Sequence, residues 1–155
     1  MKRFKFSLEA VREYRELILD EKKKELADAI QAVIRKEKEI NVLARERAGE
    51  VADFNTKKSE GMTAVDAQNC ERHIRVLQNN IDTRRQELKR LNEIEEQKKD
   101  DVVLARQEVM ALDKLKEKRI ADYNLAALKE EETLIEEIVS NQRSNILASE
   151  SKGAQ

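Results

Sequence analysis

The amino-acid sequence predicts an all-α fold: an antiparallel two-helix coiled-coil hairpin whose second helix is longer than its first. Three observations lead to this prediction. Apolar residues recur alternately three and four positions apart, which is the spacing of a coiled-coil seam. Of the 155 residues, 41% are charged, 3% are aromatic and none is proline, a composition typical of long helices. One turn signal, at Gly61, interrupts the seam.

Two apolar series make up the predicted seam. The first consists of Leu19, Leu26, Ile30, Val33, Ile40, Ala44, Val51 and Phe54. The second consists of Ala67, Cys70, Ile74, Leu77, Ile81, Leu88, Leu91, Val102, Ala105, Val109 and Leu112. Each series keeps one face of its helix toward a partner helix, and the short connection between them makes the two helices antiparallel neighbours.

Capping signals set the boundaries of the predicted elements. Ser7 precedes the first periodic residue and is a suitable N-cap. Gly61 can adopt the left-handed conformation that ends a helix, and Thr63 and Asp66 have the spacing of a capping box. The prediction is a single hairpin domain over residues 1–155, with helix one at 7–59, a turn at 60–63, helix two at 64–148 and a frayed polar tail at 149–155.

A turn centred near residues 60 and 61 also predicts a register, in which facing seam positions have numbers that add to about 121. In this register the polar residues Glu37 and Arg84 share a layer. We predict that they pair and fix the register, because a slip would leave each charge without a partner. The same register puts Lys23 opposite Lys98, which is its weakest feature.

Helix two has no intrachain partner beyond Leu112 for about 35 residues, or roughly 50 Å at the α-helical rise. The overhang nevertheless carries an apolar stripe. Its members are Leu125, Leu128, Leu134, Ile135, Ile138 and Val139. An exposed stripe of this kind marks an interaction surface, so we expect either docking on a partner protein or self-pairing of two overhangs.

The N-terminus concentrates apolar residues at Phe4, Phe6, Leu8 and Val11. One interpretation is a hydrophobic staple, or packing on helix two near Leu112 and Leu115. The other is an anchor for a partner protein. The two interpretations are compatible.

Little in the chain suggests catalytic or metal chemistry. There is one cysteine and one histidine, so no zinc-ligand spacing exists, and the three glycines are isolated, so no phosphate loop is present. The net charge of −1 comes from interleaved signs, which disfavours nucleic-acid binding. No apolar run approaches a membrane span. We expect no enzyme activity, no cofactor and no membrane insertion.

Both ends of the chain resemble the FliJ family of flagellar type III export proteins. The N-terminal positions Phe4, Phe6, Leu8 and Val11 match the family's opening, and the segment 130–138, followed by Arg143, is similar to its closing segment. The resemblance covers nearly the whole chain, although its middle is generic heptads.

The resemblance implies a cytoplasmic, non-enzymatic stalk and escort component, peripherally associated with the flagellar export apparatus of the inner membrane. Its implied partners are the hexameric export ATPase, which it binds and stimulates, the cytosolic domain of the membrane export gate, and flagellar substrate chaperones. The Phe4–Val11 cluster and the Leu125–Val139 stripe would then enter the hexamer. The alternatives are a stalk subunit of another type III secretion or rotary ATPase machine, and a generic coiled-coil scaffold.

Overall fold

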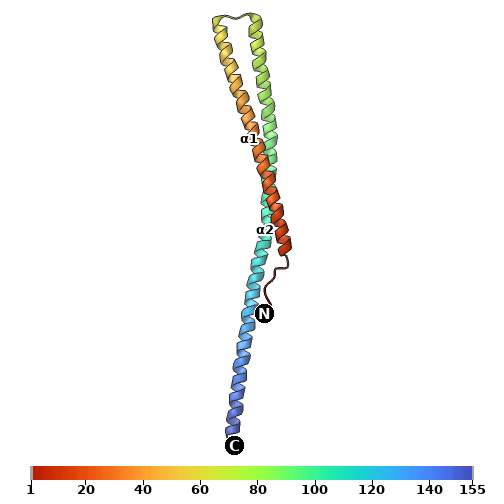
Figure 1. Cartoon of the computed structure of the whole chain (residues 1–155), viewed down its shortest axis with the longest axis vertical. Helices are drawn as coiled ribbons and strands as arrows, with labels where there is room; N and C mark the ends of the chain where they lie inside the picture. Colours follow the sequence, from red (N-terminus) through yellow and green to blue (C-terminus); the bar gives the residue numbers. More distant parts are fainter. Residues whose placement is uncertain (1, 155) are drawn as a thin grey trace. The chain divides into compact units, whose positions relative to one another are not determined.

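The computed structural model describes residues 2–154, which form two helices and no strand (Figure 1). Helix α1 spans Glu9–Glu60 and α2 spans Ala64–Gly153. The chain divides into two compact units. We call residues 16–107 the hairpin unit, and residues 1–15 with 108–155 the end unit. The prediction of an all-α hairpin with a longer second helix is confirmed.

The turn between the helices follows the predicted capping chemistry. Gly61 has a φ of +99°, which lies in the left-handed region that residues with a Cβ rarely adopt. The backbone N–H of Asp66 donates to the Thr63 hydroxyl oxygen at 3.2 Å, and the Ala67 N–H donates to the Thr63 carbonyl at 3.0 Å. Thr63 is therefore the N-cap of α2, as predicted.

The outer ends of the helices differ from the prediction. The Leu8 carbonyl accepts the first helical hydrogen bond, from the Arg12 N–H at 2.9 Å, so Leu8 occupies the N-cap position that was predicted for Ser7. At the other end α2 continues through Gly153 instead of fraying from residue 149. The Ser149 and Ser151 hydroxyls donate to the carbonyls of Ile146 and Ala148, three positions earlier in the helix, and no proline stops the helix before Gly153. Residues 1 and 155, the predicted domain limits, lie outside the described part.

The hairpin unit is held together by one narrow seam. Its buried side chains are Leu19, Ala29, Val33, Ile40, Leu77, Ile81, Val102 and Ala105. Every seam position predicted in α2 is buried or half-buried. Ala44 in α1 is exposed and Leu43 is half-buried in its place, because the alternation of three and four through Val33 and Ile40 continues to position 43.

The register of the hairpin unit follows from its ion pairs between helices. These are Glu25–Lys98 at 3.0 Å, Lys36–Glu87 at 2.9 Å, Glu39–Arg84 at 3.6 Å and Glu50–His73 at 3.7 Å. The two residue numbers add to 123 in each pair, so the predicted value of 121 is wrong. Because α1 continues to Glu60 and α2 begins at Ala64, the turn is centred on Met62 and the pairing shifts accordingly.

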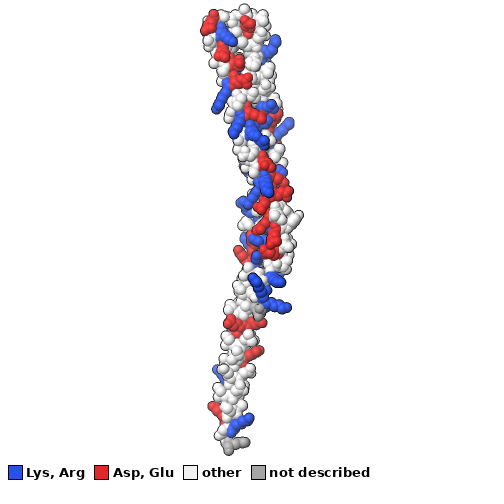
Figure 2. All heavy atoms as spheres, viewed as in Figure 1, with Lys and Arg blue, Asp and Glu red and all other residues white. Residues whose placement is uncertain are grey.

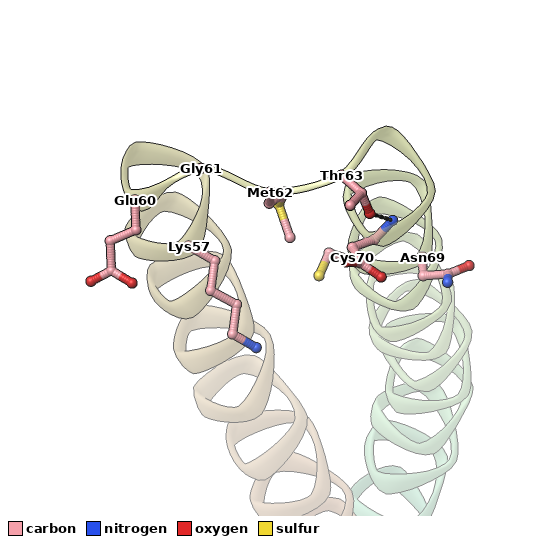
Figure 3. A pocket seen from close by; sticks show the side chains of 8 residues that line it. Lys57, Glu60, Gly61, Met62, Thr63, Asn69 and Cys70 are labelled. Carbon is pink, nitrogen blue, oxygen red and sulfur yellow. Dashed lines mark hydrogen bonds between the residues drawn. The ribbon is translucent and has the colours of Figure 1, made fainter.

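The seam side chains are less buried toward the turn. No residue from 41 to 76 is buried, and the two helices diverge toward the turn (Figure 1). A shallow pocket opens there, lined by Lys57, Met62 and Cys70 among others (Figure 3). Cys70 is half-buried.

Within residues 2–154, no helix is long and apolar enough to cross a membrane.

Two glycines allow a matched test of the turn. Gly61→Ala forces a Cβ into left-handed backbone and is expected to lower the free energy of unfolding by about 1 kcal/mol. Gly49 lies inside α1, where an added Cβ would meet nothing within 4 Å, so Gly49→Ala is expected to raise the free energy of unfolding by about 1 kcal/mol. Urea unfolding followed by circular dichroism measures both. Equal effects of the two substitutions would contradict the turn conformation.

Candidate partner-binding site

The N-terminal residues pack on α2 within the end unit. The Phe4 and Tyr123 rings meet edge to face, with centroids 5.5 Å apart. The Tyr123 hydroxyl donates to the Lys2 carbonyl at 2.6 Å. Phe6 is 9% exposed, and the Lys116 ammonium lies 5.9 Å from its ring centroid, a favourable cation–π distance. These contacts support the packing interpretation, since both aromatic rings are engaged inside the chain.

Charged side chains reinforce this attachment. Glu9 accepts hydrogen bonds from Lys116 at 2.8 Å and from Arg12 at 3.4 Å. Arg12 in turn binds Asp113. The hydrogen bond from Lys116 lowers the pKa of Glu9 below its ordinary value, against the opposing effect of burial. Carboxylates and cations therefore alternate across the contact between the two helices of the end unit.

The remaining residues of the predicted N-terminal cluster lie differently. Leu8 is half-buried, whereas Val11 is 44% exposed. Tyr14 and Leu17 are also exposed, and steps of three place Val11 and Tyr14 close together on the helix surface. Of the four predicted N-terminal site residues, Val11 is the one whose side chain is open to a partner.

The unpaired part of α2 is shorter than predicted. Residues 2–8 cover α2 as far as Tyr123, so the bare segment begins at residue 124 instead of after Leu112. It extends to Gly153, which is roughly 45 Å of helix. Within it only Ala127 is half-buried, and every other described residue is exposed. The sequence predicted packing of the N-terminal cluster on helix two as one interpretation, but it did not show how far along α2 the contact reaches, because an extended segment has no helical periodicity.

The six predicted stripe residues all lie on the bare segment and all are open to solvent. Their exposed fractions lie between 42% and 58%. Uncharged atoms make up most of the visible surface there, whereas charges crowd the hairpin unit (Figure 2). Leu128, Ile135 and Val139 follow one another by seven and four positions, and Leu134 and Ile138 by four, so the stripe runs along one side of the helix.

The predicted pair between Glu37 and Arg84 is wrong. Glu37 is exposed, and Arg84 binds Glu39 at 3.6 Å and Glu87 at 3.1 Å. Lys36, with a side chain only 17% exposed, binds the same two carboxylates at 3.0 and 2.9 Å. The observed register brings Lys36 to this contact in place of Glu37. Two cations and two carboxylates thus form one network across the seam.

This network shifts pKa values in both directions. Hydrogen bonds from Lys36 and then Arg84 lower the pKa of Glu87. Hydrogen bonds to Glu87 and then Glu39 raise the pKa of Lys36. The charged forms of both partners are therefore favoured in the folded state.

A second network resolves the predicted clash between two lysines. Lys23 is exposed, while Glu25 accepts hydrogen bonds from Lys98 at 3.0 Å and Lys22 at 3.5 Å. The hydrogen bond from Lys98 lowers the pKa of Glu25. A sequence signal for both networks exists: a basic seam residue is followed by an acid three positions later, and the motif repeats after fourteen residues. The occurrences that follow this repeat are Lys22–Glu25, Lys36–Glu39, Arg84–Glu87 and Lys98–Asp101.

Comparison with known proteins identifies the family of the chain. A family model described as the flagellar FliJ protein matches residues 4–145. The chain belongs to the FliJ family. No curated protein and no solved structure matches it. The family belongs to the flagellar protein export machinery.

Within the described residues, no three His, Cys, Asp or Glu side chains are grouped so that they could hold a metal ion.

The seam networks predict a loss of stability in acid. The pKa of Glu87 is lowered on folding, so its contribution is complete above the unfolded pKa of about 4.3 and is lost as the pH falls through the lower folded value. We expect the Tm to fall between about pH 5 and pH 3, and Glu87→Gln to flatten this part of the profile. Glu93→Gln, at an exposed position outside the networks, serves as the control. Identical profiles for the two variants would be inconsistent with the network.

The N-terminal attachment can be tested within its own segment. Phe6→Ala removes the buried ring and should release residues 2–8 from α2, increasing amide hydrogen exchange at Glu9 and Arg12 by about tenfold, equivalent to about 1.4 kcal/mol. The Tm of the whole chain should change little, because the seam of the hairpin unit is untouched. Lys5→Ala, exposed in the same segment, should leave exchange unchanged. Equal exchange in both variants would exclude Phe6 as the anchor.

Proposed function

We propose that this FliJ family member is a non-enzymatic, cytoplasmic stalk and escort component of the flagellar export apparatus. It binds the hexameric export ATPase and stimulates ATP hydrolysis by contact. It also links the ATPase to the cytosolic domain of the membrane export gate and to flagellar substrate chaperones, and it associates peripherally with the apparatus at the inner membrane. The observation that carries this proposal is the bare segment of α2, whose apolar stripe has no covering partner in the described chain.

We assign the ATPase contact to two parts of the end unit. Leu125, Leu128 and Val139, with the rest of the stripe, offer exposed apolar area at helical spacing, which suits docking of a helix in an apolar groove. Val11 adds exposed apolar surface from α1. Phe4, Phe6 and Leu8 remain predicted contacts. Phe4 and Phe6 pack on α2, and we infer that they act by holding the N-terminus beside the start of the bare segment.

An apolar stripe is also compatible with self-association, which is the second candidate. Two bare segments could cover each other's stripes as an antiparallel pair. Sedimentation of the isolated protein distinguishes the two cases, because docking on an ATPase leaves the isolated chain monomeric. A stalk role in another secretion or rotary ATPase machine would use the same surface, and the family match favours the flagellar apparatus.

The decisive experiment is stimulation of the purified export ATPase. The wild-type protein is expected to raise the rate of ATP hydrolysis. The double variant Ile135→Ser with Val139→Ser should require at least about tenfold more protein for the same effect, since each lost apolar contact removes about 1 kcal/mol or more. Val103→Ser with Leu104→Ser removes similar exposed apolar area from the hairpin unit and should behave as wild type. No stimulation by saturating wild-type protein would refute the proposed function.

A further inference from the structure

The bare segment of α2 carries an unusual concentration of acid. Five of the eight residues from 130 to 137 are glutamates, and none of these eight residues is basic. The glutamates are Glu130, Glu131, Glu132, Glu136 and Glu137. All five are exposed, and none has an ion-pair partner among residues 2–154. This acidic cluster therefore coincides with the middle of the apolar stripe.

The helical spacing places these carboxylates around the stripe. With 3.6 residues per turn, Glu130 and Glu137 lie on one edge beside Leu134. Glu132 and Glu136 lie on the opposite edge beside Val139. Glu131 lies within the stripe, three positions after Leu128 and four before Ile135. A partner that covers the apolar side chains must accommodate negative charge on both edges and at the centre.

Elsewhere the chain places cations against the carboxylates that border its helix contacts. Glu25 and Glu87 in the hairpin unit each have two basic partners, and Glu9 in the end unit binds Arg12 and Lys116. Burying an unpaired carboxylate costs several kcal/mol, and pairing it offsets much of this cost. The partner surface that complements the bare segment is therefore apolar and is bordered by lysine and arginine side chains.

We propose that residues 124–146 of α2 dock as a helix into an apolar groove of the export ATPase that is rimmed by basic side chains. This rests on the proposed function and names the chemistry of its partner surface. The glutamates steer the encounter and select the register, while the apolar stripe supplies most of the buried area. Thr133 and Ser140 lie on the side away from the stripe and remain in solvent.

The same charges disfavour other occupants of the stripe. A second copy of this chain would bring a second set of five glutamates to the contact, and like charges across an interface oppose association. Lys129 and Arg143 are the basic residues that flank the cluster, and two cations in each copy are too few to neutralise five glutamates in each copy. An anionic membrane surface and nucleic acid are repelled for the same reason.

The test compares two triple charge reversals in the full-length protein. The rim variant carries Glu130→Lys, Glu132→Lys and Glu137→Lys. The control carries Glu71→Lys, Glu93→Lys and Glu117→Lys, which changes the net charge equally at exposed positions of α2 outside the bare segment. Glutamate and lysine have similar helix propensities, so circular dichroism should show the same helicity for both. Binding to the purified ATPase is measured from about 50 to 500 mM salt.

We expect the rim variant to bind at least about tenfold more weakly than wild type at low salt, with a shallower dependence on salt. The control should bind as wild type does. If wild type binds and the rim variant binds equally well, the basic groove is excluded while the proposed function stands. Failure of wild type to bind overturns both. A wild-type dimer that the Ile135→Ser and Val139→Ser double variant dissociates would assign the stripe to a second copy and overturn the inference.

Discussion

The turn centred on Met62 is the constraint on which the hairpin unit depends. Gly61 ends α1 in a conformation that a side chain disfavours, and Thr63 caps α2. Three residues separate the two helices, so there is little slack in how α2 returns along α1. All four ion pairs between the helices of the hairpin unit then share one register. A difference of one or two residues at the turn changes which charges meet along the seam.

The ion networks contribute more to register than to the strength of the fold. Their members are partly exposed, and exposed ion pairs stabilise proteins only slightly. Lys36 and Arg84 nevertheless lie at seam positions where a displaced register would leave a cation against apolar side chains. The apolar seam holds the helices together, and the charged layers define which of its positions face each other.

The end unit uses its residues in two ways. The N-terminal segment covers α2 up to Tyr123 through aromatic and charged contacts. Beyond that residue the same helix exposes an apolar stripe bordered by unpaired glutamates. The proposed export role depends on the exposed stripe and its acidic borders. The other apolar and charged surfaces named above already contact each other within the chain.

The sequence alone determined the all-α hairpin, the turn at Gly61, nearly all of the α2 seam and the exposed stripe, since these follow from local spacing and capping chemistry. It could not determine the register, because the turn is centred on Met62 instead of near residues 60 and 61, and Arg84 therefore meets Glu39 instead of Glu37. It offered packing of the N-terminal cluster on helix two as one interpretation, but it could not show that this contact reaches Tyr123, because an aperiodic segment has no register along its partner helix. Which charges meet, and where α2 becomes bare, depend on contacts between residues up to 121 positions apart, and only the tertiary structure decides those.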